Sequence, residues 1–322
     1  MLPPKDKLTI CFAHAAYQMA ERFAARATGI GHFQVRTPEA FAARLPEADV
    51  VVISMLWRNE LLPTATRLKF IQSISAGMDR YDPALIAKQG IRLASAAGVN
   101  ANAVAEHAMA LILALKRHLH TGRDNQAQKR WRGMISEIGE REDELGGKVL
   151  LIVGLGRIGA RLARLAKAFD LTVMATRRDP ALGAGDADTV FAQQRLEELL
   201  PKADIVALTC PLTPQTENLI NAQTLGLMKP TAQLINVARG RVVDEQALIR
   251  ALVEKRIASA ALDVTCEEPL SAASPLWGMS NVLITPHTAG ETQRYEDRVI
   301  DLLLANLERL WRGEPHLVNG VV

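Results

Sequence analysis

The 322-residue sequence predicts an α/β fold class: two doubly wound domains, each built on a parallel sheet. Three observations predict it. Short apolar runs alternate with helical patterns along the chain, the chain is long enough for two domains or one large α/β unit, and only 4 % of its residues are aromatic although 48 % are hydrophobic. Ala, Leu, Ile and Val must therefore fill the core, and these residues dominate parallel strands buried beneath helices.

The first alternating series of strands and helices fills the N-terminal third of the chain. Apolar, β-rich runs predict four strands, over Leu8–Phe12, Val50–Ile53, Lys69–Ser73 and Ile91–Leu93. Helical patterns predict two helices in this region, over Ala15–Ala27 and Pro83–Gln89. A long helix rich in Ala and Leu is expected at about Asn102 to His120, and the polar stretch Thr121–Glu144 that follows carries few strand or core signals.

A second alternating series starts at Lys148. Its predicted strands are Val149–Val153, Leu171–Ala175, Ile205–Thr209, Gln233–Val237, Ser259–Val264 and Val282–Thr285. Its predicted helices begin near Ile158, Gln194, Asp244 and Glu291, and Asp244 is a plausible N-cap of the third. Parallel strands of this kind bring their carboxyl ends to one edge of the sheet, which is where ligands bind in such folds.

A glycine-rich turn separates the first strand and the first helix of this second series. Its sequence, Gly154-Leu-Gly156-Arg-Ile-Gly159, directly follows Val149–Val153 and directly precedes the helical run Ala160–Phe169. The first glycine allows the tight bend, the second lets a pyrophosphate approach the backbone, and the third lets the helix pack closely on the strand. The phosphates then meet the partially positive N-terminus of the helix. The strand-turn-helix context predicts a dinucleotide-binding site.

The end of the next strand indicates which nicotinamide cofactor is preferred. An acidic residue is expected there in an NAD enzyme, where it binds the adenosine ribose hydroxyls. This sequence has Thr176-Arg177-Arg178 instead, and the nearest acid, Asp179, lies beyond the strand end. The two guanidinium groups suit a 2′-phosphate, and Thr176 offers a hydroxyl. We therefore expect NADP(H) to be preferred, with NAD(H) possible.

Three further segments place an arginine, a carboxylate and a histidine at or just beyond strand ends. The segments are Asn236-Val-Ala-Arg239-Gly, Leu262-Asp-Val-Thr-Cys-Glu-Glu268-Pro and Thr285-Pro-His287. Each has an ordinary structural explanation when it is taken alone. Together they supply Arg239, Glu268 and His287 at the same edge of the same sheet, which is the set needed to bind an anionic carbonyl substrate and to move a proton.

With these segments in this order, the sequence resembles the D-isomer-specific 2-hydroxyacid dehydrogenases, a family that reduces 2-keto acids or oxidises D-2-hydroxy acids with NAD(P). The similarity covers nearly the whole chain. Besides the segments above, it rests on Ser75-Ala-Gly-Met-Asp79, Val104-Ala-Glu-His107 and Cys210-Pro-Leu-Thr213. The resemblance implies two Rossmann-like domains, with a dinucleotide-binding domain (residues 99–290) inserted into a flavodoxin-like substrate domain (residues 1–98 and 291–322).

The same resemblance implies roles for individual residues. Arg239, Glu268 and His287 would be catalytic, and Ala76 and Gly77 would present backbone N–H groups to the substrate carboxylate. In addition to the three glycines, the cofactor contacts implied by the family come from Arg157, Ile158, Cys210, Val237, Ala238 and Asp263.

The chemistry of reduction suggests what each catalytic group does. A hydride reaches C2 and a proton reaches the carbonyl oxygen, and His287 is the nearby group that titrates around neutrality. Glu268 would keep the imidazole protonated, and Arg239 would hold the carboxylate and polarise the carbonyl. Glu268 is favoured because it directly precedes Pro269, as the catalytic Glu of the family does, and Glu267 is the alternative.

Three positions have more open interpretations. Trp57 is expected either to line the substrate pocket or to pack on the domain surface. The first alternative follows from the family, in which the segment after this strand lies near the crevice between the two domains. The helix Ala101–Leu115 is apolar nearly all round and is expected to be buried, and the resemblance suggests that it helps to form a two-fold homodimer. His107, on this helix, is interpreted as an interdomain or interface residue in preference to a catalyst.

Composition argues against several other classes of protein. The net charge is +3, no basic block is longer than a pair, and aromatic residues are few, so nucleic-acid binding is not expected. The cysteines Cys11, Cys210 and Cys266 are far apart and form no C-x-x-C, so we expect no disulfide framework, no metal site and a reducing, cytoplasmic environment. No run of 18 uncharged apolar residues occurs, so no membrane span is expected.

The leading hypothesis is a reductase that uses NADP(H) to act on a small 2-keto acid such as glyoxylate or hydroxypyruvate. A D-lactate- or D-3-phosphoglycerate-type dehydrogenase is the alternative within enzymes. The chain ends at Val322 without room for an appended regulatory domain, which slightly disfavours the phosphoglycerate type. Outside enzymes, the alternative is a dinucleotide-sensing protein like the transcriptional corepressors of this fold, which retain the Arg, Glu and His set.

Overall fold

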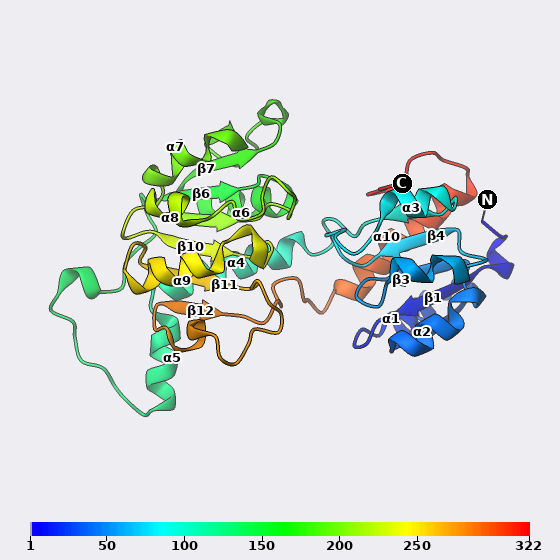
Figure 1. The fold of residues 1–322 in the computed structure, drawn as a ribbon, viewed down its shortest axis with the longest axis horizontal. Coiled ribbons are helices and arrows are strands. Elements are labelled where there is room, and N and C mark those ends of the chain that lie inside the picture. Colours follow the sequence, from blue (N-terminus) through cyan, green and yellow to red (C-terminus); the bar gives the residue numbers. More distant parts are fainter. Residues whose placement is uncertain (1) are drawn as a thin grey trace. The chain divides into compact units, whose positions relative to one another are not determined.

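The structure of the protein is a computed structural model that describes residues 2–322 as two compact units (Figure 1). One unit combines Met1–Asn100 with Thr292–Val322, and the other is Ala101–Glu291. The boundaries expected from the sequence fall after Gly98 and after Gly290. Each unit is an α/β domain with an all-parallel sheet, so the predicted fold class is confirmed.

The unit formed from both ends of the chain has a five-stranded sheet in the order β2-β1-β3-β4-β5. The strands are β1 (Thr9–Ala13), β2 (Gly31–Val35), β3 (Val50–Ile53), β4 (Phe70–Ser73) and β5 (Arg92–Ala94). Helices α1 (Met19–Ala24) and α10 (Tyr295–Trp311) bury Phe23 and Leu303 against one face of the sheet. Helices α2 (Pro38–Arg44) and α3 (Pro83–Lys88) bury Phe41 and Ile86 against the other.

The inserted unit has a seven-stranded sheet in the order β12-β11-β10-β9-β6-β7-β8. The strands are β6 (Val149–Val153), β7 (Thr172–Arg177), β8 (Thr189–Ala192), β9 (Ile205–Leu208), β10 (Gln233–Asn236), β11 (Ser259–Leu262) and β12 (Val282–Ile284). Helices α4 (Ala101–Lys116) and α6 (Arg157–Lys167) cover one face. Helices α7 (Leu196–Leu199), α8 (Ala222–Gly226) and α9 (Glu245–Val253) cover the other.

The predicted strands are all present, within a residue or two at their ends, but two strands escaped prediction. β2 and β8 lie at sheet edges, and most of their residues are half-buried or exposed. The faces of these two strands are only partly covered, so their sequences lack the continuous apolar run of a strand buried on both faces. The short helices α2 and α8 were missed as well.

Helix α1 begins later than the sequence predicts, at Met19 instead of Ala15. The ring nitrogen Nδ1 of His14 accepts hydrogen bonds from the backbone N–H groups of Ala16 (3.1 Å) and Tyr17 (2.9 Å). These bonds hold the chain in a turn, so the helix cannot start until that turn is complete.

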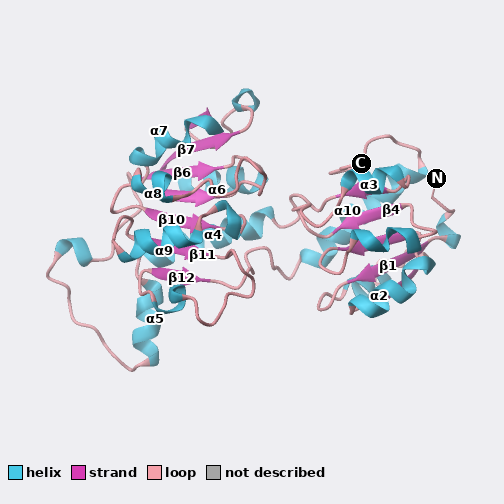
Figure 2. Ribbon diagram, viewed as in Figure 1, coloured by secondary structure: helices cyan, strands magenta, loops and turns pink. Residues whose placement is uncertain are grey.

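The long helix predicted from Asn102 to His120 is broken. α4 ends at Lys116, His118 adopts a left-handed conformation with φ 48°, and α5 (Leu119–Ala127) begins a separate helix. Figure 2 shows the segment after α5 as a long loop, which agrees with the few core signals of the predicted polar stretch. Among the helices of residues 2–322, none combines the length and the apolar character needed to cross a membrane.

Candidate active site

The candidate residues of the Ala101–Glu291 unit all lie at the carboxyl end of its parallel sheet, at or just after the ends of its strands. The glycine-rich turn follows β6, Arg177 and Arg178 are at the end of β7, and Cys210 is just after β9. Val237, Ala238 and Arg239 follow β10, Asp263 and Glu268 follow β11, and His287 follows β12. Because every strand pair is parallel, these loops share one edge of the sheet, as expected for a ligand-binding edge.

Each of the three positions in the turn requires glycine for a different structural reason. Gly154 has φ 104°, and a Cβ there would lie 2.7 Å from the backbone of Cys210. A Cβ on Gly159, in the first turn of α6, would lie 2.6 Å from the carbonyl oxygen of Gly154. Gly156 has open space in front of it, since a Cβ there would have no neighbouring atom within 4 Å. The first and third glycines therefore allow close packing, and the second leaves a cradle.

This cradle fits the pyrophosphate of a dinucleotide. α6 begins at Arg157, so the N–H groups of its first turn, which includes Ile158 and Gly159, have no carbonyl partner within the helix. An anion at this end of α6 would meet those groups and the positive end of the helix dipole. The open space at Gly156 is therefore where a phosphate group can approach the backbone.

Thr176 supports the glycine-rich turn through its backbone. Its carbonyl oxygen accepts hydrogen bonds from the N–H groups of Gly154 (3.0 Å) and Leu155 (2.8 Å), so it fixes the glycine-rich turn. Its side chain is completely buried, and its hydroxyl is one of the buried polar atoms without a hydrogen-bond partner in residues 2–322. The protein covers this hydroxyl, and its contact with a 2′-phosphate stays a prediction.

Arg177 and Arg178 are at the end of β7, and neither is buried. Nη1 of Arg177 donates to the carbonyl oxygen of Gly183 at 2.8 Å, which steadies the guanidinium beside the strand end. The nearest acid, Asp179, accepts a hydrogen bond from the backbone N–H of Ala181 with its side chain and caps a turn. The strand end therefore presents positive charge.

Arg239 is half-buried in the turn that follows β10. Asn236 shapes this turn, because its side chain accepts from the N–H of Ala238 (3.0 Å) and donates to the carbonyl of Arg239 (3.1 Å). Nη1 of Arg239 donates to the carbonyl of Ala238 at 2.7 Å. A Cβ on the next residue, Gly240, would overlap the backbone of Thr265, so this glycine lets the β10 loop pack directly on the β11 loop.

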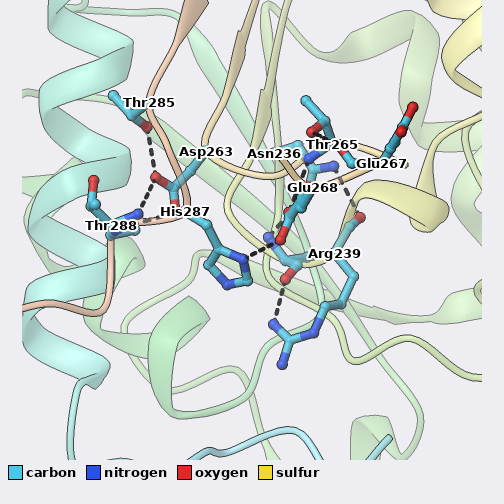
Figure 3. Close-up of polar contacts among 11 residues, drawn as sticks. Asn236, Arg239, Asp263, Thr265, Glu267, Glu268, Thr285, His287 and Thr288 are labelled. Carbon is cyan, nitrogen blue, oxygen red and sulfur yellow. Dashed lines mark hydrogen bonds and ion pairs between the residues drawn. The ribbon is translucent and has the colours of Figure 1, made fainter. Parts of the chain in front are cut away.

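The β11 loop brings the carboxylate of Glu268 to the imidazole of His287 (Figure 3). Oε2 of Glu268 lies 2.7 Å from Nδ1 of His287, and Oε1 accepts from the N–H of Thr265 at 3.2 Å. Glu267 contributes its backbone carbonyl, which accepts from the Thr265 hydroxyl at 2.7 Å. The structure therefore pairs His287 with Glu268, the first choice from the sequence, and not with Glu267.

The electrostatics of this pair favour a charged imidazole. The hydrogen bond that His287 donates to Glu268 raises the pKa of His287 above its usual value, although burial and the charge of Arg239 oppose the rise. Burial by itself would raise the pKa of Glu268, but the bond to His287 and the nearby charges of His287 and Arg239 bring it below its usual value. Both shifts favour the charged forms of the pair, a protonated imidazole on His287 and an ionised carboxylate on Glu268.

Asp263, predicted to contact the cofactor, is almost completely buried at the end of β11. Its carboxylate accepts hydrogen bonds from the Thr285 hydroxyl (2.6 Å) and from the N–H groups of Thr288 (3.0 Å) and Ala289 (3.1 Å). These bonds hold the loop that carries His287. Sequence reasoning missed Thr285 and Asn236 as supports, because hydroxyl and amide residues beside strand ends are common and carry no distinctive pattern.

Cys210, Val237 and Ala238 are also nearly buried. Burial raises the pKa of the Cys210 thiol to about 11, so the thiol is neutral at physiological pH. All three lie just after the ends of β9 and β10, where the sequence analysis expects contacts with the cofactor.

The remaining predicted site residues belong to the unit formed by the chain ends. Ala76 is exposed and Gly77 is half-exposed, both in the loop after β4. Trp57 is only 1 % exposed, stacks on Tyr81 with ring centroids 6.0 Å apart, and donates from Nε1 to Asn59 at 2.9 Å. The ring of Trp57 is therefore packed in the core of its own domain, and a role in substrate binding stays a prediction. Across residues 2–322, no three His, Cys, Asp or Glu side chains gather as a metal site would require.

Comparison with known proteins gives consistent similarities. Residues 109–289 match the family described as "D-isomer specific 2-hydroxyacid dehydrogenase, NAD binding domain". The chain is 37 % identical over 297 residues to a glyoxylate reductase of Pyrococcus furiosus, a match covering 88 % of this chain and 86 % of the relative.

Two solved structures are similar over nearly the whole chain. One is an NADPH-dependent glyoxylate/hydroxypyruvate reductase from Sinorhizobium meliloti in complex with NADP and malonate, with 26 % identity and a TM-score of 0.83 over 98 % of this chain and 97 % of that one. The other is an NAD-dependent formate dehydrogenase from Staphylococcus aureus in complex with NAD, with 26 % identity and a TM-score of 0.81 over 98 % of this chain and 99 % of that one.

Proposed function

Because this chain belongs to the D-isomer specific 2-hydroxyacid dehydrogenase family, we propose that it transfers a hydride between a nicotinamide cofactor and C2 of a small 2-keto acid or D-2-hydroxy acid. Reduction of glyoxylate or hydroxypyruvate is the reaction we favour, because relatives named for these substrates match most of the chain. The observation that carries the proposal is the 2.7 Å bond between His287 and Glu268, beside Arg239.

The proposed mechanism assigns one task to each group. A bound NAD(P)H supplies the hydride. The charged His287 donates its Nε2 proton to the carbonyl oxygen, since Nδ1 is held by Glu268. Arg239 binds the substrate carboxylate and stabilises the negative charge that grows on the oxygen. In the oxidation direction, the neutral imidazole of His287 accepts the proton instead.

We assign the two units to the two ligands. The inserted domain would bind the dinucleotide at the glycine-rich turn and the first turn of α6, through Arg157 and Ile158, with Cys210, Val237, Ala238 and Asp263 completing that edge. The domain formed by the chain ends would bind substrate, with the backbone of Ala76 and Gly77 donating to its carboxylate. Both assignments follow the family pattern.

We further propose that NADP(H) is preferred over NAD(H). The support is the pair Arg177 and Arg178 at the end of β7, together with the use of the Asp179 carboxylate in a local cap. A charge-assisted contact to a 2′-phosphate is worth roughly 1.5 to 3 kcal/mol, or about ten- to a hundredfold in kcat/KM.

The preference is tested by comparing kcat/KM for NADPH and NADH in the wild type and in the double variant Arg177→Ala/Arg178→Ala. The wild type should favour NADPH, and the double variant should lose the preference while keeping its activity with NADH. Equal kcat/KM for the two cofactors in the wild type would contradict the proposal.

We propose that the protein is a cytoplasmic homodimer. Cys11, Cys210 and Cys266 are all free thiols, as is usual in a reducing compartment. The loop after α5 carries Trp131, which is 98 % exposed, and Met134, which is fully exposed. Large apolar side chains displayed so openly on one segment suit contact with a second copy of the chain.

The function is tested with a panel of 2-keto acids, measured by the loss of absorbance of NADPH or NADH. Glyoxylate and hydroxypyruvate should be reduced. Preferential reduction of pyruvate would instead favour a D-lactate-type dehydrogenase, and preferential reduction of 3-phosphohydroxypyruvate would favour a D-3-phosphoglycerate-type dehydrogenase. Dinucleotide binding without turnover of any 2-keto acid would contradict the proposal and would favour a dinucleotide sensor.

A further inference from the structure

Behind His287, a chain of hydrogen bonds runs from the β12 loop to helix α4. Nε2 of His107 lies 2.9 Å from Oγ1 of Thr285, and Oγ1 of Thr285 lies 2.6 Å from Oδ1 of Asp263. His107 and Thr285 are 178 residues apart in the sequence, so this contact joins α4 to the catalytic edge. The sequence interpretation of His107 as an interdomain or interface residue did not anticipate these partners.

The direction of each bond in this chain follows from the donors available. The carboxylate of Asp263 accepts bonds from two backbone N–H groups, so Thr285 must use its only proton as donor to Asp263. The Thr285 oxygen can then only accept from His107. His107 therefore carries a proton on Nε2 and donates it to Thr285.

The far end of this chain fixes the backbone around His287. The carboxylate of Asp263 holds the N–H groups of Thr288 and Ala289, and its carbonyl oxygen accepts from the N–H of His287 at 2.8 Å. His287 itself has φ 56°, a left-handed conformation that is uncommon for a residue with a Cβ. The direction of the imidazole therefore depends on the bonds made by Asp263.

We propose that His107 is a positioning residue for His287, acting through Thr285 and Asp263. It would not touch substrate or cofactor. Its task is to donate to Thr285, so that the Thr285 hydroxyl stays turned toward Asp263 and the loop keeps its left-handed turn. The catalytic part of this inference rests on the proposed function, whereas the part about the loop rests on the bonds alone.

His107 is suited to this task by its location. It is held on α4, a 16-residue helix whose neighbouring residues Val104, Ala108 and Leu111 are buried in the core of the inserted domain. Its own side chain is about three-quarters covered, with 25 % exposed. A donor on a rigid helix can hold a loop in place, because the helix loses little freedom when the bond forms.

The test compares variants that remove the donor with variants that keep it. His107→Phe removes one hydrogen bond of the chain and Thr285→Val removes two, whereas His107→Gln keeps an N–H donor and Thr285→Ser keeps the hydroxyl. Glu106→Gln changes the exposed neighbour of His107 and is the matched control. The thermal midpoint of each variant identifies any that fails to fold, and the Thr285 pair covers a failure of the His107 pair.

The first readout is amide hydrogen exchange of the segment that contains Thr288 and Ala289, which needs no enzymatic activity. Exchange of these amides should be about tenfold faster in His107→Phe and Thr285→Val, and unchanged in His107→Gln, Thr285→Ser and Glu106→Gln. The second readout is turnover. Loss of the bond should lower kcat roughly three- to tenfold with a smaller change in KM for the keto acid.

A double variant tests whether His107 and Thr285 act through the same chain of hydrogen bonds or independently of each other. The double variant His107→Phe/Thr285→Val should be no slower than Thr285→Val, because both changes break the same chain. Unchanged exchange and unchanged kcat in His107→Phe would overturn the proposal, and so would multiplied losses in the double variant. An inactive wild type would contradict the proposed function alone, since the exchange comparison would still decide the role of His107.

Discussion

The imidazole of His287 is held from two sides, at its ring by Glu268 and at its backbone by Asp263. The ring bond decides its charge, because the carboxylate raises the pKa of the imidazole. The backbone bond decides its direction. The proposed proton transfer depends on both bonds. Two substitutions distinguish the effect of removing the imidazole from the effect of changing its pKa.

Replacing His287 by alanine removes the proposed proton donor while leaving the glycine-rich turn in place. We expect His287→Ala to lower kcat for keto acid reduction by about 10²- to 10⁴-fold, the usual contribution of a general acid, with little change in the Kd of the dinucleotide. Steady-state kinetics and fluorescence titration measure the two quantities. His316→Ala, at an exposed histidine of the other domain, is the control, and near-normal turnover in His287→Ala would remove this residue from the mechanism.

Replacing Glu268 by glutamine removes the negative charge that stabilises the imidazolium. The pKa of His287 should then fall, so the decline of kcat/KM for reduction at alkaline pH should begin at a lower pH in Glu268→Gln than in the wild type. The raised pKa also stabilises the fold at low pH, and this contribution is lost as pH rises through the folded-state pKa. A pH profile measures the shift.

Glu267→Gln is the matched control for this pH profile. Glu267 accepts a hydrogen bond from Thr265 with its backbone carbonyl, which the substitution leaves in place. Its profile should match that of the wild type. If Glu267→Gln moved the profile and Glu268→Gln did not, the pairing of the two acids with His287 would be reversed.

At the scale of secondary structure, apolar runs predicted the central strands well because these strands are buried on both faces. β6 and β3, for example, have the predicted ends. The edge strands β2 and β8 could not be found in this way, since their half-exposed residues include polar ones. The break at His118 was not predictable either, because a left-handed residue inside a helical pattern leaves no local signal in the sequence.

The site was predictable to the extent that it depends on residue type at strand ends. Arg239, Glu268 and His287 could be chosen in this way, and the structure places them at one edge. Burial was the information that the sequence lacked. Trp57 and Thr176 have suitable chemistry at suitable positions, but tertiary packing covers their side chains, and no local pattern distinguishes a covered residue from an open one.

The glycine-rich turn gives a prediction at the element scale. Gly156→Ala places its methyl group in open space, so the free energy of unfolding should change by less than about 0.5 kcal/mol while dinucleotide affinity falls. Gly159→Ala places its methyl group against the Gly154 carbonyl, so it should lower the free energy of unfolding by roughly 1 to 3 kcal/mol. Urea denaturation and fluorescence titration measure both. Equal dinucleotide affinity in Gly156→Ala and the wild type would argue against the cradle.

At the scale of the whole molecule, the order of segments along the chain is more informative than any single motif. The chain starts one domain, builds a second from Ala101 to Glu291, and returns to the first with α10. The low aromatic content fits this plan, because both sheets are buried on both faces by helices and are filled mainly by aliphatic side chains.

The proposed homodimer gives a prediction at this scale. Sedimentation should give the mass of two chains, and Trp131→Ser/Met134→Ser should shift the equilibrium toward one chain, because these side chains are open to solvent in a single copy. Trp277→Ser, at another exposed tryptophan, is the control and should leave the mass unchanged. A wild type that sediments as a single chain at micromolar concentration would contradict the dimer.

In the proposed function, His287, Glu268 and Arg239 together drive the reduction of a small 2-keto acid. The most direct measurement is the rate of NADPH oxidation by purified protein with glyoxylate, for the wild type and for His287→Ala side by side. We expect steady turnover by the wild type and a loss of about 10²-fold or more in the variant. Tight binding of NADPH with no oxidation by glyoxylate or hydroxypyruvate, or equal rates in the two proteins, would contradict it.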